Sequence, residues 1–357
     1  MANGQRPPEP DFNRFLKVLR REGEPDRVPF CELYHDQEIM AAIQGPPQTP
    51  PEDTDGWARW WAKFWRHHGY DYVTGRLSIG FPRPGINAPD TAILSRGKRG
   101  WVNESKGPIT NWEQFERYPW PEVTDEGFRP LEAQARCLPE GMRIVPMIPG
   151  GPLENLTFLM GYETFVYALA DDPALVEAIA TRVGETLLEI VQRTVSLEEV
   201  GAQWLNDDLG FRSGPLASPE VLRKYVFPWH QRMCEIAHAA GKPILLHSCG
   251  NLRVIMDELI DGVGIDAKHS FEHVIEPVWE AKRAWGDRIA LLGGVDMHVM
   301  ASGTEEEVRA YTRRCVEECA PGGGWALGTG NSVANYVPVR NFLAMLDEGW
   351  KVGRYSY

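Results

Sequence analysis

Long apolar runs are absent from this sequence. No stretch approaches the roughly 20 apolar residues that a membrane-spanning helix requires, and the first ten residues contain no apolar segment of the signal-peptide kind. Cysteine is also scarce, since six cysteines are scattered over 357 residues without the dense framework of a small secreted domain. These absences predict a soluble, cytoplasmic protein whose thiols are reduced.

Positive charge is in deficit as well. The 37 lysines and arginines face 50 aspartates and glutamates, which gives a formal net charge of -13 at pH 7. A protein that binds nucleic acid or an anionic membrane usually carries the opposite excess. The sequence therefore predicts a small molecule as the ligand, and neither nucleic acid nor a membrane as a partner.

Strand-like and helix-like segments alternate along the chain, and no Gly-rich dinucleotide fingerprint follows the first strand. The strand-like segments are residues 28–33, 72–74, 143–147, 202–205, 243–246, 264–267, 289–292 and 325–327. Helical periodicity is clearest at residues 11–21, 55–68, 153–170, 174–197 and 218–238. Eight strands separated by helices predict an α/β fold of the (β/α)8 TIM barrel type, with a single domain over residues 1–357. A doubly wound open sheet is the alternative.

Two segments depart from this rhythm. Residues 77–128 are rich in Gly and Pro and contain two short extended runs, at 91–94 and 100–104. We expect a hairpin insertion after the second strand, over the barrel mouth. The helix at 55–68 carries a row of aromatic residues, which predicts core packing or a subunit interface and leaves a homodimer open. These residues are Trp57, Trp60, Trp61, Phe64 and Trp65.

The strongest signal of a functional site lies between Lys242 and Asn251. The apolar run at 243–246 leads directly into His247 and Cys249, and a Gly-Asn turn follows. Residues i and i+2 of an extended chain point to the same side, so this imidazole and this thiol can share one cation such as zinc. A buried structural histidine beside a small apolar cysteine is the alternative.

Polar residues follow the other predicted strands too. In a TIM barrel these strand ends meet at the face where barrel enzymes keep their chemistry. We expect Asp207, Asp208, Lys268 and Asn331 to be catalytic, His35, Asp296, Thr329 and Asn335 to bind substrate, and Glu32 to add a carboxylate ligand to the metal site. Of the adjacent pair Asp207 and Asp208, only one can face inward, and the sequence leaves open which one.

Four short motifs and a Gly-rich C-terminal part occur in an order that is typical of one superfamily. The motifs are Gly-Pro-Leu-Glu at 151–154, Asn-Asp-Asp-Leu-Gly at 206–210, Ser-Pro-Glu at 218–220 and His-Ser-Cys-Gly at 247–250. The chain resembles the uroporphyrinogen decarboxylase superfamily, most specifically over residues 150–340. The resemblance implies one of two activities. Members are either decarboxylases that need no metal or cofactor, or zinc-dependent cobamide methyltransferases whose zinc is held by a His-x-Cys pair and a later Cys.

The sequence departs from the decarboxylase pattern after its first strand. Decarboxylases carry Arg-Gln-Ala-Gly-Arg there, and these arginines grip substrate carboxylates. Residues 29–36 contain no arginine and include Glu32 and Asp36, which disfavours a porphyrinogen substrate.

The sequence also lacks the later Cys of the methyltransferases, because residues 328–331 read Gly-Thr-Gly-Asn. Cys315 and Cys319 are close in sequence, but they share a helical face with apolar residues, and a capping box of Thr304 and Glu307 begins that helix. Core packing is therefore the expected role of these two cysteines.

We therefore expect zinc-dependent methyl transfer between a small molecule and a corrinoid on a partner protein. The expected ligands are His247, Cys249 and a carboxylate from Glu32 or Asp208. Two alternatives remain open. One is a cofactor-independent decarboxylase in which Asp207 or Asp208 stabilises a protonated ring, and the other is a barrel that binds a small molecule without catalysis.

Overall fold

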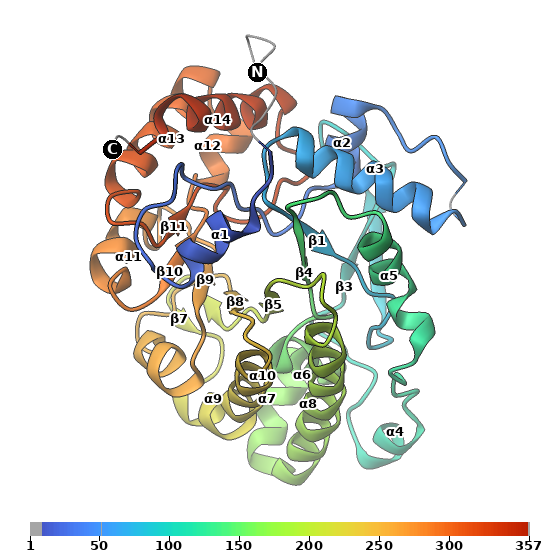
Figure 1. Ribbon diagram of the computed structural model, residues 1–357. Coiled ribbons are helices and arrows are strands. Elements are labelled where there is room, and N and C mark those ends of the chain that lie inside the picture. The colour runs from blue at the N-terminus through green and yellow to red at the C-terminus, as the bar shows by residue number, and fades with distance from the viewer. Residues whose placement is uncertain (1–8, 51, 356–357) are drawn as a thin grey trace.

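The computed structural model describes residues 9–50 and 52–355 of the chain. Parallel strands lie at the centre and helices surround them (Figure 1). The parallel strands are β1 (Tyr72–Gly75), β4 (Arg143–Pro146), β5 (Gln203–Asn206), β8 (Ile244–His247), β9 (Ala267–His269), β10 (Ala290–Leu292) and β11 (Trp325–Ala326). Two antiparallel pairs lie outside this set, namely β2 (Gly85–Pro89) with β3 (Lys98–Val102), and β6 (Gly210–Phe211) with β7 (Gly214–Pro215).

Helices connect the strands. The α-helices are α1 (Phe12–Leu19), α2 (Gln37–Gln44), α3 (Thr54–His67), α4 (Trp112–Arg117), α5 (Arg129–Arg136), α6 (Pro152–Met160), α7 (Tyr162–Asp171), α8 (Pro173–Val195), α9 (Pro219–Tyr225), α10 (Phe227–Ala239), α11 (Val278–Trp285), α12 (Met297–Ser302), α13 (Glu305–Cys319) and α14 (Val339–Val352). Two further turns are η1 (Asp125–Phe128) and η2 (Glu258–Val263). Among the described residues, no helix is both long and apolar enough to cross a membrane.

The parallel strands follow the order expected for a wound α/β fold. Strands β11, β10, β9, β8 and β5 form one sheet, and β1 pairs with β4 in a second. Two bridges, Ile144 with Val200 and Met147 with Trp204, join the β4 segment to the β5 segment, and a bridge between Phe30 and Leu327 places the N-terminal segment beside β11. The strands thus share one direction, so their carboxyl ends lie on one face.

The predicted first strand, residues 28–33, does not form in the structure. Pro29 has no amide hydrogen, and only the isolated bridge at Phe30 pairs this segment with β11. Toward β1, the contact is made by side chains, since the Thr74 hydroxyl donates to the Leu33 carbonyl at 2.7 Å. Within the described residues, backbone ladders therefore form a parallel α/β sheet but do not close an eight-stranded barrel.

Other elements shift for local reasons. The predicted helix at 153–170 is divided at Gly161, whose φ of +80° ends α6. The predicted helix at 218–238 is divided between α9 and α10, where Pro228 enters the first turn of α10. Strand β9 begins three residues later than predicted, because Gly264 adopts a left-handed conformation after η2.

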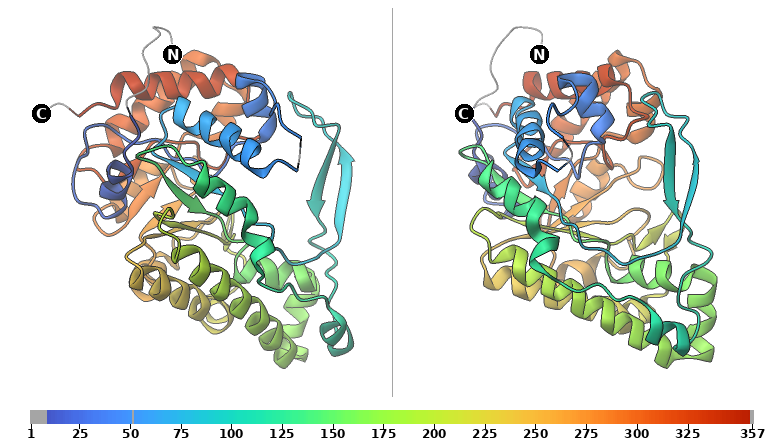
Figure 2. Two further views of the ribbon diagram at one scale, coloured as in Figure 1. Left: turned by 45° about the vertical axis from the view of Figure 1, so that its right-hand side comes forward. Right: turned by 90° about the vertical axis from the view of Figure 1, so that its right-hand side faces the viewer.

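A hairpin is present after β1, and β3 overlaps the predicted arm at 100–104, but the other arm lies earlier in the chain than predicted. Strands β2 and β3 pair antiparallel, and the predicted arm at 91–94 falls in the connection between them. The two strands lie at the edge of the molecule in Figure 2, and the connection between them is bound to the rest of the chain through hydrogen bonds from Asn335 to Asp90 and Leu94.

The apolar interior contains the aromatic face of α3. Trp61, Phe64 and Trp65 are buried there. Cys315 and Cys319 are buried on α13, and the predicted capping box begins that helix. Both cysteines therefore pack in the core, as the sequence predicts.

Candidate metal centre

His247 is the last residue of β8, at the carboxyl end of the sheet. The three residues before it are fully buried, which fixes the strand and aims the imidazole at the mouth. The chain then turns at Gly250, which has a φ of +82° and whose added Cβ would lie 2.3 Å from the backbone of Gly210. Only glycine fits both conditions. The turn leaves Cys249 beside His247.

Asp208 completes a group of three donors. It follows β5, whose last residue Asn206 pairs with His247 on the neighbouring strand. Donor atoms of Asp208, His247 and Cys249 all lie within 4.8 Å of one another. The Nε2 atom of His247 is 3.7 Å from Cys249 Sγ and 3.8 Å from Asp208 Oδ1.

The two separations measured from His247 Nε2 fit a common zinc ion. Bonds of about 2.0–2.3 Å in a tetrahedral site place donor atoms roughly 3.3–3.8 Å apart. Carboxylate, imidazole and thiolate are all accepted zinc ligands, and three protein donors leave one position for water or substrate, as in catalytic zinc sites. A cation would also offset the adjacent negative charges of Asp208 and a Cys249 thiolate.

The Cys249 sulfur is surrounded by donors. Asn331 Nδ2 lies 3.3 Å from it and the Ser270 hydroxyl lies 3.4 Å from it, and both donate to the sulfur. Burial, and then the Asp208 carboxylate, raise the pKa of the Cys249 thiol to about 12 in the absence of a cation. The donors are thus placed for a thiolate that only a bound cation would produce at neutral pH.

His247 is supported from behind by His269. Their Nδ1 atoms are 2.8 Å apart, so one ring donates and the other accepts. Burial lowers the pKa of His247 to about 4 and holds that of His269 well below its usual value, which keeps both rings neutral. If His247 Nδ1 is the donor, its Nε2 lone pair faces Asp208 and Cys249. This is the arrangement that orients a metal-binding imidazole.

Lys268 comes directly before His269 in β9, and its side chain is buried. Its ammonium group donates to the Ser270 carbonyl and lies 4.2 Å from the centre of the Phe271 ring. Burial lowers the pKa of Lys268 to about 8. Ser270 has a φ of +84°, which is rare for a residue other than glycine. That backbone strain is consistent with a functional position, because it holds the hydroxyl against Cys249.

Asp207 points away from the three donors. Its carboxylate accepts from the main-chain N–H groups of Leu153 and Glu154 and contacts His230 Nε2 at 2.9 Å. It therefore binds the positive end of α6, and Asp208 is the member of the pair that faces the site. The packing is tight, since a Cβ on Gly151 would lie 2.1 Å from that of Asp207.

The Gly151→Ala substitution should therefore destabilise the protein by about 1–3 kcal/mol, because the methyl group must displace Asp207 or α6. Urea unfolding measures this change. Gly214→Ala is the matched control, since a Cβ there has no atom within 4 Å. Equal stability of the two variants would contradict the close packing of Asp207.

Glu32 lies outside the group of three donors. Thr329 holds both of its carboxylate oxygens, with the main-chain N–H donating at 2.8 Å and the hydroxyl at 2.6 Å. Burial raises the pKa of Glu32 to about 8. Glu32 and Thr329, predicted as a metal ligand and a substrate-binding residue, are thus hydrogen-bonded to each other.

The other three predicted substrate-binding residues have structural partners. The His35 ring packs edge-on against the four aromatic rings of Phe64, Trp65, Tyr70 and Phe342. Asp296 caps α12 by accepting from His298 N. Asn335 donates to Asp90 and to the Leu94 carbonyl.

Sequence reasoning missed two residues beside the donors. His269 is the last residue of β9, which begins three residues later than the predicted strand. Its pairing with His247 is visible only in the register between β8 and β9. Glu154 belongs to the Gly-Pro-Leu-Glu motif, but it received no role. Burial and the nearby Asp207 and Asp208 raise the pKa of Glu154 to about 8.

A parallel α/β sheet with three possible metal ligands at the strand ends defines a class of candidate metal-binding proteins. This class contains many families. The family follows from comparison with known sequences. Residues 98–350 match the family described as uroporphyrinogen decarboxylase (URO-D), and the chain belongs to that family. The resemblance seen in the sequence motifs is therefore confirmed.

Two individual proteins illustrate this relation. A uroporphyrinogen decarboxylase from Thioalkalivibrio sulfidiphilus is 26% identical over 215 residues, which are 58% of this chain and 56% of that protein. The match thus spans little more than half of the relative. A methyltransferase from Methanosarcina mazei has a similar fold, with a TM-score of 0.70, 16% identity, and coverage of 95% of this chain and 97% of that one.

Proposed function

We propose that this chain is a zinc-dependent methyltransferase that moves a methyl group between a small molecule and a corrinoid on a partner protein. The observation that carries the proposal is the cluster of Asp208, His247 and Cys249 within 4.8 Å. The decarboxylases of the superfamily need no metal, so a group of three possible metal ligands favours the methyltransferase. The methyltransferase fold found in Methanosarcina mazei is compatible with this reading.

The residues of the site would have different roles. Asp208, His247 and Cys249 would hold zinc, which would lower the pKa of a bound thiol or hydroxyl acceptor or polarise a methyl ether oxygen. His269 orients the His247 ring through the contact between their Nδ1 atoms. Asn331 and Ser270 hold the sulfur of Cys249 by hydrogen bonds.

The identity of the carboxylate ligand can be tested directly. Wild-type protein loaded with zinc and then desalted should carry close to one zinc per chain, and Asp208→Asn should bind zinc roughly 10- to 100-fold more weakly. Glu32→Gln is the matched control, because Thr329 already holds the Glu32 oxygens. Metal analysis measures the zinc content of each protein, and competition with a chromophoric chelator measures its affinity for zinc. Loss of zinc in Glu32→Gln with retention in Asp208→Asn would assign the ligand to Glu32 instead.

The reaction itself is tested with free methylcobalamin and a panel of small thiols. Zinc-loaded protein should demethylate methylcobalamin, followed by its visible spectrum, and metal-free protein should not. The proposed transfer would be contradicted if zinc-loaded protein transferred no methyl group from methylcobalamin to the thiols and none from methylated small molecules to chemically reduced cob(I)alamin.

Decarboxylation is the alternative, and the structure bears on it through two arginines near the mouth. Arg96 contacts Asp36 and Glu38 at 2.8 and 2.9 Å, so its charge is already neutralised. Arg76 alone cannot bind the many carboxylates of uroporphyrinogen. We therefore expect no measurable conversion of uroporphyrinogen to coproporphyrinogen, and turnover in a fluorimetric porphyrin assay would favour the decarboxylase.

A further inference from the structure

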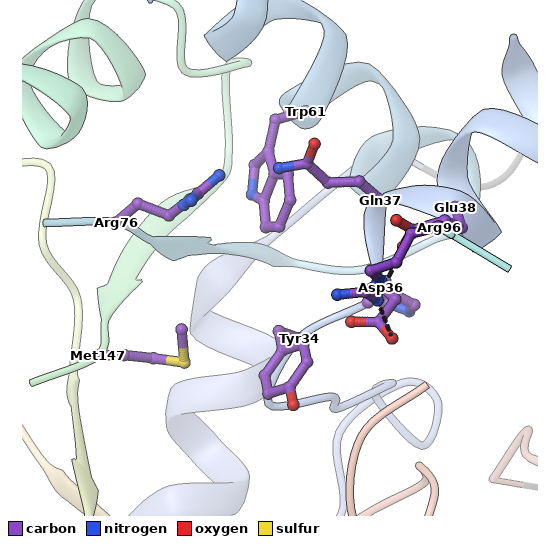
Figure 3. A pocket seen from close by; sticks show the side chains of 9 residues that line it. Tyr34, Asp36, Gln37, Glu38, Trp61, Arg76, Arg96 and Met147 are labelled. Carbon is purple, nitrogen blue, oxygen red and sulfur yellow. Dashed lines mark hydrogen bonds and ion pairs between the residues drawn. The ribbon is translucent and has the colours of Figure 1, made fainter. Parts of the chain in front are cut away.

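A second polar feature opens beside the predicted metal centre. A pocket of about 400 Å³ lies over the ends of β1 and β4 and over the start of α2. Tyr34, Trp61, Met147 and Arg76 form part of its wall, and the rest consists of polar or charged residues, namely His35, Asp36, Gln37, Glu38 and Arg96. Figure 3 shows Arg76 and Met147 on one side of this space, with Trp61 and Tyr34 across from them.

Arg76 brings an uncompensated positive charge to this pocket. Burial lowers its pKa, and the ion pairs among the described lining residues of this pocket are made by Arg96 and not by Arg76. Its guanidinium lies 4.8 Å from the centre of the Trp57 ring, and Trp57 stacks on Trp61 at 4.9 Å. The two indoles therefore hold the cation in place at the pocket wall.

The other cation of the pocket differs in this respect. Arg96 forms ion pairs with Asp36 and Glu38, so it has carboxylate partners within the protein. Arg76 is thus the cation that is free to bind an anion among the described lining residues. A guanidinium presents planar donors that match the geometry of a carboxylate.

We propose that this pocket binds a small carboxylate with a flat apolar body, whose carboxylate lies on Arg76 and whose body lies among Trp61, Tyr34 and Met147. Pockets of this size bind small molecules, and a few placed polar groups among apolar side chains fix the orientation of the ligand. Here Arg96 pairs with Asp36 and Glu38, which leaves Arg76 as the group for the carboxylate. This proposal names a substrate class for the proposed methyl transfer. The assignment of the ligand as substrate therefore rests on the proposed function.

The pocket lies on the same face of the sheet as the donor cluster. The pocket uses the ends of β1 and β4, whereas the cluster uses the ends of β5 and β8 on the same face. A ligand anchored on Arg76 would therefore lie on the face of the sheet that also carries Cys249.

Calorimetric titration with benzoate tests the proposal, with benzamide as its uncharged analogue. Wild-type protein should bind benzoate at least about 10-fold more tightly than benzamide, and Arg76→Gln should remove that preference. Arg117→Gln is the control, because it removes an exposed arginine on α4 that forms an ion pair with Glu113. Thermal unfolding of each variant should show that the fold is unchanged.

Two outcomes would overturn the proposal. One is equal affinity of wild-type protein for benzoate and benzamide, and the other is an unchanged benzoate affinity in Arg76→Gln. Failure of the zinc proposal is distinguishable from both. Cys249→Ser should lose zinc and keep benzoate binding, whereas Arg76→Gln should lose benzoate binding and keep zinc.

Discussion

Replacing Cys249 with serine should lower the affinity for zinc by about 100-fold and remove methyl transfer, while the fold remains intact. Zinc binding in small sites contributes about 10–16 kcal/mol, so one of three or four ligands carries roughly 3 kcal/mol. The serine hydroxyl does not ionise near neutral pH, and it replaces a soft donor with a hard one. Because Cys249 lies at the end of a turn, the change leaves no cavity in the core.

Cobalt gives an independent reading of the same ligand. Wild-type protein with cobalt(II) in place of zinc should show the near-ultraviolet absorption of a thiolate-to-metal charge transfer, and Cys249→Ser should lack it. Cys137→Ser is the control, since this cysteine lies near Asp55, and its sulfur is 3.6 Å from that residue's carbonyl. Retention of zinc and of the thiolate band in Cys249→Ser would show that another cysteine binds the metal.

Much of the fold follows from the sequence because burial and strand ends leave local patterns. Seven of the eight predicted strands are present, and His247 stands at the carboxyl end of β8 as expected. The prediction of a strand at 28–33 was wrong because it followed the apolar composition of the segment and gave no weight to Pro29, which removes a ladder donor. The divided helices failed for a similar reason, since Gly161 and Pro228 are single residues inside otherwise helical patterns.

The candidate site was predictable where it depends on spacing and not where it depends on long-range pairing. His247 and Cys249 share a side of one extended segment, which a sequence shows directly. The assignment of Glu32 required the knowledge that Thr329, almost three hundred residues later, holds its carboxylate. The role of His269 likewise depends on the register between β8 and β9.

Wild-type protein should lose stability relative to Glu32→Gln as the pH rises from about 5 to about 8. Burial raises the pKa of the folded Glu32 carboxyl to about 8, above the value of about 4.5 that it starts from. The folded state therefore holds this proton more strongly than the unfolded state, so stability is full below pH 4.5 and falls as the pH passes through 8. At 1.4 kcal/mol per pKa unit, the difference reaches no more than about 5 kcal/mol.

Glutamine keeps an oxygen that accepts from the Thr329 N–H, and it cannot ionise. It therefore removes the loss of stability with rising pH and leaves no cavity at position 32. Urea unfolding at pH 5, 7 and 9, with a chelator present in every sample, measures the difference in the free energy of unfolding between the two proteins. Glu113→Gln is the matched control, because the Glu113 side chain is 69% exposed on α4 and its removal should give a difference that does not change with pH. A constant difference between Glu32→Gln and wild-type protein, or a wild type that gains stability toward pH 9, would show that Glu32 is charged in the folded protein and that an unrecognised cation balances it.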